Sequence, residues 1–125
     1  MLIEKVCAYN SERVVIVVDE KKVVGRLGDT FPIPLEIIPA ARIPVTRALE
    51  REGFEVTLRE AERKMGAVIT DNGNMLLDVR VPSERPAPEL EELFASIPGI
   101  AESGVFSRLE PVVLIGRRDG SVEAL

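Results

Sequence analysis

The 125-residue sequence contains no histidine, no tryptophan and a single cysteine, Cys7. The lack of histidine excludes a Ser-His or Cys-His nucleophile pair. With one cysteine and no closely spaced set of carboxylates, a metal site is not expected either. A single cysteine also excludes an internal disulfide and fits a reducing compartment. The nine glycines are scattered at turns, so no glycine-rich phosphate-binding loop precedes a helix.

Positive charge and aromatic side chains are also scarce. The chain has 16 lysine and arginine residues against 21 aspartate and glutamate residues, and aromatic residues make up 4%. Nucleic-acid binding needs a positive field, and RNA binding on a sheet needs an aromatic platform, so neither is expected. The longest apolar runs are too short to cross a bilayer, and the first residues have no signal-peptide pattern. We therefore expect a cytoplasmic protein with no nucleic-acid or membrane partner.

The sequence is rich in aliphatic residues, and hydrophobic residues make up 46% of a chain about as long as one domain. Residues 2–7 carry apolar side chains at helical spacing, which predicts a short amphipathic helix with Cys7 as a small core residue. Residues 14–18 are all β-branched, a pattern typical of a central parallel strand covered on both faces. A helical turn is expected over 21–27. Residues 111–115 predict a second strand in the same sheet as 14–18.

The middle of the chain alternates strands and helices. Pro32 and Pro34 indicate a lobe boundary or an edge strand. The patterns that follow predict the order β-α-β, β-α-β, the split order of a ferredoxin-like lobe, with strands over 35–38, 54–58, 75–81 and 100–106 and helices over 41–52 and 88–97. We therefore expect an α/β fold. Residues 1–29 and 111–125 would form a partial doubly wound (Rossmann-like) sheet, and residues 30–110 an inserted ferredoxin-like α+β lobe.

The pair Asn72-Gly73 lies between two apolar segments, which is the strongest short-range signal for a β-hairpin. Both central residues of such a two-residue turn need positive φ, which asparagine and glycine adopt at the least cost. Backbone geometry accounts for the polar residues of the turn. We therefore expect structural roles for Asp71, Asn72, Asn74 and Asp78, and likewise for Arg42.

Four stretches of the sequence together resemble the type A ribose-5-phosphate isomerases, and they occur in the order that the family has. They are Glu4-Lys5, Ile37-Ile38-Pro39-x-Ala41-Arg42, Thr70-Asp71-Asn72-Gly73-Asn74-x-Leu76-Leu77-Asp78 and the stretch from Ile97 to Phe106. The resemblance implies a cofactor-free aldose–ketose isomerase of the pentose phosphate pathway, which interconverts D-ribose 5-phosphate and D-ribulose 5-phosphate through an enediolate. It also implies a homo-oligomer, either a dimer or a tetramer.

The resemblance assigns roles to Glu4 and Lys22. By its pattern alone, Glu4 is a solvated glutamate that the helix dipole favours in a first turn. The matching glutamate of the family is the general base, and burial can raise the pKa of such a carboxylate toward working pH. By its pattern alone, Lys22 is an exposed lysine. Aligned through Asp19, it matches the family lysine that contacts the substrate, and the adjacent Lys21 is the alternative.

The family pattern has further parts upstream: a Thr/Ser-rich phosphate loop, an acidic segment, and a lysine before a glycine run. None of them occurs in these 125 residues. The groups that stabilise the enediolate oxygens are therefore missing, and such stabilisation is usually the largest contribution to catalysis. We expect a carboxyl-terminal portion with little or no turnover in isolation. It would come from a truncated chain, which we favour, from a split enzyme whose other half is separate, or from a descendant that kept the lobe for binding.

The rival hypothesis belongs to a different class of function. A ferredoxin-like lobe with exposed strand edges can serve as a non-catalytic module for oligomerisation or for binding a small ligand.

Overall fold

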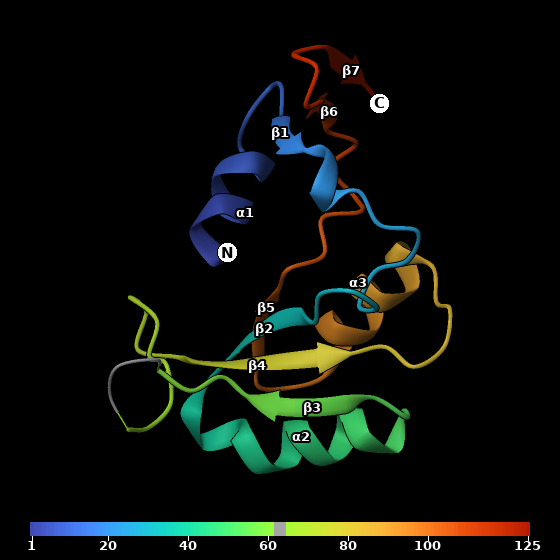
Figure 1. The fold of residues 1–125 in the computed structure, drawn as a ribbon. Coiled ribbons are helices and arrows are strands. Elements are labelled where there is room, and N and C mark those ends of the chain that lie inside the picture. The colour runs from blue at the N-terminus through green and yellow to red at the C-terminus, as the bar shows by residue number, and fades with distance from the viewer. Residues whose placement is uncertain (62–64) are drawn as a thin grey trace.

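The structure is a computed structural model that describes residues 1–61 and 65–125. It is a mixed α/β protein, and its described residues form two sheets and three α-helices (Figure 1). The helices are α1 (Leu2–Tyr9), α2 (Arg42–Arg51) and α3 (Ala87–Ser96). The strands are β1 (Val15–Asp19), β2 (Ile33–Ile37), β3 (Glu55–Leu58), β4 (Met75–Arg80), β5 (Ile100–Ser103), β6 (Val112–Gly116) and β7 (Val122–Ala124). None of the helices in the described part of the chain is long and apolar enough to cross a membrane.

The smaller sheet has the strand order β1-β6-β7 and lies with α1 at one end of the molecule (Figure 1). β1 and β6 pair in parallel, from Val15 opposite Val112 to Asp19 opposite Gly116. The prediction that these two segments, which lie far apart in the sequence, belong to one sheet is confirmed. The covering of both faces that a run of β-branched residues typically indicates is not found within the described residues, because β1 is an outer strand of this sheet and Val17 is 73% exposed. A run of β-branched residues has the same pattern whether or not its faces are covered.

The larger sheet has the strand order β3-β4-β2-β5, and all its neighbouring strands are antiparallel. Alternate residues of a strand point to the same face, so Ile33, Leu35 and Ile37 of β2 face one side together. Residues of α2 and α3 join them in a single buried cluster, in which the rings of Phe54 and Phe94 lie 5.8 Å apart. Pro32 and Pro34 suggested an edge strand as one of two alternatives. That alternative is wrong, because β2 lies between β4 and β5 in the sheet. Pro34 has no amide hydrogen to donate, but its carbonyl oxygen still takes part in the pairing with the chain after β5, accepting a hydrogen bond from the Gly104 amide (2.8 Å).

The predicted hairpin turn is present, but its type differs from the expected one. The Thr70 amide donates to the Asn74 carbonyl (2.8 Å), and the Gly73 amide donates to the Thr70 carbonyl (2.9 Å). Gly73 has a φ of +77°, whereas Asn72 has a negative φ. This is the pattern of a three-residue loop, in which a type I turn is followed by a left-handed glycine. Asn-Gly suits both turn types, so the dipeptide could not distinguish them.

Two expectations near the amino end need correction. Only Glu20–Lys22 forms a helical turn, of the 3₁₀ type, after β1. The β-branched Val23 and Val24 and then Gly25 are poor helix formers, so the expected helix over 21–27 does not continue. Cys7 is exposed rather than part of a core. The apolar stripe of α1 is not its buried face, because the residue of α1 that is buried is Lys5.

Candidate functional site

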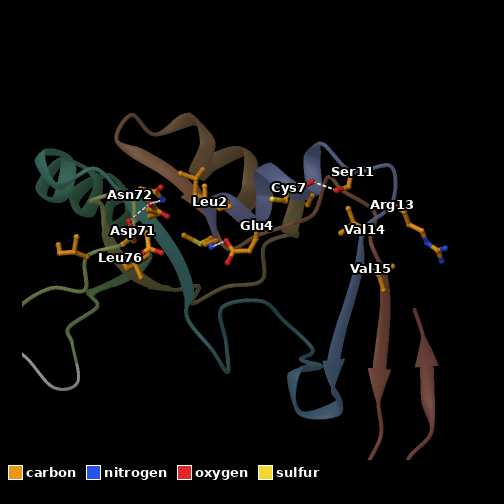
Figure 2. A pocket seen from close by; sticks show the side chains of 16 residues that line it. Leu2, Glu4, Cys7, Ser11, Arg13, Val14, Val15, Asp71, Asn72 and Leu76 are labelled. Carbon is orange, nitrogen blue, oxygen red and sulfur yellow. Dashed lines mark hydrogen bonds and ion pairs between the residues drawn. The ribbon is translucent and has the colours of Figure 1, made fainter.

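A cavity of about 870 Å³ lies between α1, the segment that leads into β1, and the hairpin turn of the larger sheet (Figure 2). Three carboxylate side chains line it: Glu4 from α1, Glu36 from β2 and Asp71 from the turn. Figure 2 shows Glu4 between the turn residues on one side and Val14 and Val15 on the other. The cavity therefore brings together segments from both sheets.

Glu4 is in the first turn of α1, and its side chain is largely exposed. Its carboxylate forms an ion pair with the amino group of Met1. That hydrogen bond, a backbone hydrogen bond and the attraction of the amino group lower the pKa of Glu4 below its ordinary value. Glu4 is thus ionised at neutral pH and can accept a proton. The burial that would raise its pKa toward working pH is not provided by the described residues.

Lys22 lies elsewhere. It ends the 3₁₀ turn after β1, and the Asp19 side chain caps that turn by accepting a hydrogen bond from the Lys21 amide (3.0 Å). The Lys22 ammonium lies 5.0 Å from the centre of the Phe31 ring and lines a second cavity of about 170 Å³. Lys21 does not line that cavity. The structure therefore does not bring Glu4 and Lys22 into one cavity.

Glu36 is a cavity residue that the sequence analysis missed. It is 2% exposed, and one of its oxygens, Oε1, accepts hydrogen bonds from Thr70 Oγ1, Asn72 Nδ2 and Asn74 Nδ2, each 2.9 Å long. Burial raises the pKa of Glu36, but the bonds from Asn74, Asn72 and Thr70 outweigh it, so the pKa lies below its ordinary value. The side chains of the turn, which backbone geometry seemed to explain, thus hold a buried carboxylate.

A signal for this contact was present in the sequence. Glu36 is the charged residue of an otherwise apolar and proline segment, and the turn offers three donors at alternate positions. Strand alternation alone would place Glu36 on the solvent side, between the buried Leu35 and Ile37. The donors are 34 to 38 residues away along the chain, so only the pairing of β2 with β4 brings them to it.

Lys5 is a second residue whose role the sequence did not indicate. Its side chain connects α1 to α3 and to β5 of the larger sheet. Its buried ammonium donates to Glu91 Oε1 (2.9 Å), Glu102 Oε1 (2.7 Å) and the Val105 carbonyl oxygen (2.6 Å). Burial raises the pKa of Glu91, but hydrogen bonds from Ser107 and Lys5 outweigh it, so this pKa also lies below its ordinary value. Because Glu4 precedes Lys5 in the helix, this anchor sets where the Glu4 carboxylate lies.

The side chains that line the large cavity include several hydrogen-bond acceptors and few positively charged groups. Arg13 and the Met1 amino group are the positive groups among the residues that line it. No group of three or more Cys, Asp or Glu side chains in the described ranges is placed to hold a metal ion. The arrangement suits proton transfer at a carboxylate, or binding of a hydrogen-bond donor or a cation.

Comparisons with known proteins agree on one family. Residues 1–120 match the family model described as ribose 5-phosphate isomerase A (phosphoriboisomerase A). The ribose-5-phosphate isomerase A of Treponema denticola is 46% identical over 127 residues, which cover 100% of this chain and 53% of that protein. The solved structure of the Methanocaldococcus jannaschii enzyme is 45% identical with a TM-score of 0.90, covering 99% of this chain and 54% of the other.

A further solved structure is a D-ribose-5-phosphate isomerase in complex with phospho-erythronic acid. It is 34% identical with a TM-score of 0.91, over 98% of this chain and 53% of the other. The chain thus spans about half the length of the relatives that it matches.

Proposed function

This chain belongs to the ribose 5-phosphate isomerase A family, and we propose that it is the carboxyl-terminal portion of an enzyme that interconverts D-ribose 5-phosphate and D-ribulose 5-phosphate. The observation that carries the proposal is the match of residues 1–120 to the family, with a relative that is 46% identical over the whole chain. A related structure binds phospho-erythronic acid, which supports a sugar phosphate as the substrate. The reaction would pass through an enediolate and would need no cofactor.

Glu4 is proposed as the general base. It would remove a proton from the carbon next to the sugar carbonyl and return it to the neighbouring carbon. Its position in the large cavity and its ionised state support this role. Lys22 is proposed as a substrate contact, because it follows the carboxyl end of a parallel strand, where ligands of open α/β sheets bind.

The chain on its own is proposed to have little or no turnover. Glu4 and Lys22 line separate cavities, and the described residues leave the Glu4 carboxylate exposed. Groups that stabilise the enediolate oxygens usually contribute most to such a reaction, and the motifs matched in this chain do not supply them.

The finer architecture is also proposed. Residues 30–110 would be a ferredoxin-like lobe, which the strand order β3-β4-β2-β5 and the split β-α-β pattern support. Residues 1–29 and 111–125 would be part of a Rossmann-like sheet, which the parallel pair β1 and β6 supports. We place the protein in the cytoplasm, as its single cysteine and the sequence of its first residues suggest, and we propose a homo-oligomer, a dimer or a tetramer, from the resemblance.

The experiment is an isomerase assay with ribose 5-phosphate. The chain is assayed alone and after co-expression with the complementing portion, defined as the part of the Methanocaldococcus jannaschii relative that this chain does not match. Little or no turnover is expected alone, and isomerisation is expected in the co-expressed sample. There Glu4→Gln should lower kcat at least about 100-fold, because it removes the general base. Glu12→Gln, at an exposed glutamate just after α1, should leave kcat unchanged.

Two outcomes would contradict parts of this proposal. A complex that forms but does not isomerise the sugar, or that keeps its activity with Glu4→Gln, would remove the catalytic assignment. Robust activity of the chain alone that Glu4→Gln abolishes would keep the assignment and show that the site is complete in this chain.

The second candidate function is a non-catalytic module for oligomerisation or small-ligand binding. The observation that favours it is the buried cluster, whose core members all lie between Ile33 and Val105, so that this lobe has a core of its own. Light scattering and the melting temperature with added ribose 5-phosphate distinguish the two functions. Dimerisation without a sugar-phosphate shift of the melting temperature would favour the module.

A further inference from the structure

We propose that Asn72 is a site of spontaneous covalent modification, at which its side-chain amide is lost as ammonia, and that the hydrogen bond from this amide to Glu36 keeps the reaction slow in the folded chain. The product is an aspartyl or isoaspartyl residue in the hairpin turn, on the wall of the large cavity (Figure 2). The inference goes beyond the proposed function and does not depend on any activity of the chain.

The reaction needs only an asparagine side chain, the backbone nitrogen of the next residue and water. The Gly73 nitrogen attacks Asn72 Cγ, the Cγ–Nδ2 bond breaks, and Nδ2 leaves as ammonia with the proton that the Gly73 nitrogen gives up. A cyclic imide remains. Water then adds to one of the ring carbonyls and breaks its bond to the Gly73 nitrogen, which regains a proton. Addition at Cγ gives aspartate, and addition at the main-chain carbonyl carbon of residue 72 gives isoaspartate.

The residue that follows each asparagine decides which of them reacts. The chain has three asparagines, Asn10, Asn72 and Asn74. Asn72 is exposed, and a Cβ added at Gly73 would meet no described atom within 4 Å, so the attacking nitrogen is open to approach. Glycine also adopts backbone conformations that side chains exclude. Ser11 and Met75, which follow the other two asparagines, carry side chains that crowd the attack.

The hairpin turn holds both reacting groups in hydrogen bonds. The Gly73 amide donates to the Thr70 carbonyl oxygen (2.9 Å), and Asn72 Nδ2 donates to Glu36 Oε1 (2.9 Å). The attack requires the Gly73 nitrogen to lose its proton and the Asn72 side chain to turn its Cγ toward that nitrogen, so both bonds must break first. Exposed turns open locally without unfolding the core. The rate of the reaction therefore follows how often the turn opens.

Glu36 controls this opening because its carboxylate is the shared acceptor of the turn. Oε1 also accepts hydrogen bonds from Thr70 Oγ1 and Asn74 Nδ2, so three side chains of the turn meet at one oxygen of a buried glutamate. The lowered pKa of Glu36 keeps it ionised at neutral pH, and hydrogen bonds to an ionised group are stronger than those between neutral groups. A residue of β2 thus protects an asparagine of the turn.

The modification also prevents the turn from closing again in its former arrangement. In aspartate a carboxylate oxygen replaces the Nδ2 donor, which lies 2.9 Å from Glu36 Oε1, and like charges so close repel each other. In isoaspartate the main chain runs through Cβ and Cγ of residue 72, so the hydrogen bond from Gly73 to Thr70 loses its geometry. Either product adds a negative charge to the cavity wall beside Asp71 and Glu36.

The test is peptide mapping by mass spectrometry after incubation at neutral pH. Loss of ammonia is expected at Asn72 and not at Asn10 or Asn74. It should be at least about tenfold slower in the folded chain than in urea, because the turn is held closed. In folded Glu36→Gln it should be about fivefold faster than in the unaltered chain, because the acceptor is neutral. Thr70→Val, which removes another donor to the same oxygen, should act in the same direction.

The matched control is Val79→Ala. It removes buried methyl groups at the far end of β4 from the turn and so lowers global stability without touching the turn. Its rate of ammonia loss should equal that of the unaltered chain. The aspartyl product is imitated by Asn72→Asp, which should speed hydrogen exchange of the Thr70 and Gly73 amides at least about fivefold. Asn10→Asp should leave this exchange unchanged.

The other outcomes overturn the proposal. Absence of reaction at Asn72 in urea, or a reaction at Asn74 that is as fast, would show that Asn72 is not the reactive asparagine. Equal rates in urea and in the folded chain would show that the turn does not protect it. Equal acceleration by Val79→Ala and Glu36→Gln would show that global unfolding, and not the bond to Glu36, sets the rate.

Discussion

Glu36 is a buried residue of β2, and one oxygen of its carboxylate accepts hydrogen bonds from side chains of the hairpin turn. Three donors to an anion compensate for its loss of hydration, and a hydrogen bond to a charged group contributes about 1.5–3 kcal/mol. The Thr-Asp-Asn-Gly-Asn stretch therefore does more than close a turn, because its side chains place a charge at the wall of the large cavity.

The pH dependence of stability should report this contact. Since the pKa of Glu36 in the fold lies below its ordinary value of 4.5, the unfolded chain binds the proton first as the pH falls. Its contribution to stability is present above that value and is lost as the pH falls through the folded-state pKa. Glu36→Gln should lower the free energy of unfolding by about 1–3 kcal/mol at pH 7. The difference from the unaltered protein should shrink as the pH falls below that ordinary value and through the folded-state pKa.

Urea unfolding followed by circular dichroism at a series of pH values makes this measurement. Glu55→Gln, at an exposed glutamate of β3, is the control and should change little at any pH. Parallel curves for the unaltered protein and Glu36→Gln would show that the buried carboxylate is not held in its charged form.

At the scale of elements, the connection between α3 and β5 is a point of close packing. Pro98-Gly99 ends the helix region, Gly99 has a φ of +101°, and its carbonyl accepts a hydrogen bond from the Ile38 amide (3.0 Å). A Cβ at this position would overlap the Cβ of Ala41 and come within 3.2 Å of Val45 Cγ2. The connection thus lies against the start of α2 and sets how the two helices share the core.

Gly99→Ala should therefore destabilise the protein through both strain and overpacking, by about 3 kcal/mol or more. Gly120→Ala is the matched control, because Gly120 also has a positive φ (+86°) but has open space around it. It should cost only the backbone strain, about 1–2 kcal/mol. Chemical denaturation of both variants measures the difference, and equal losses would show that the contact with α2 is not tight.

Most helices and strands could be predicted from local sequence patterns. The predictions that failed share one cause, which is contact with residues far away along the chain. Helix α2 and strands β3 and β4 lie where periodicity, Gly53 and the Asn-Gly pair indicate, because those signals act within a few residues. The face of α1 could not be predicted in this way. Ile3, Val6 and Cys7 are exposed and Lys5 is buried, because the partners of Lys5 are 86 to 100 residues away along the chain.

At the scale of the whole molecule, the two sheets are unequal. The buried cluster lies entirely between Ile33 and Val105, whereas in the smaller sheet Ile115 is the buried apolar residue. Lys5 links the two regions, because it ties α1, beside the smaller sheet, to α3 and β5. Its ammonium also lies 4.9 Å from the Phe106 ring centre.

Lys5→Met should remove this link. It leaves Glu91 buried without its cation, and breaking one partner of a buried ion pair costs about 3–5 kcal/mol. Urea unfolding should show that loss, and hydrogen exchange should speed up across α1. Lys21→Met, at an exposed lysine, should change stability by less than about 0.5 kcal/mol. Unchanged exchange in α1 would show that other contacts hold the helix.

The sequence was sufficient for the order of most elements, for placing two distant apolar runs in one sheet, for the hairpin and for the family, because these depend on short motifs and local periodicity. Only the tertiary structure decided which charges are buried and that Glu4 and Lys22 line different cavities. Burial of a charge depends on donors that arrive from other elements. No pattern within one element records whether a distant Thr70 or Glu91 will be there to pair with it.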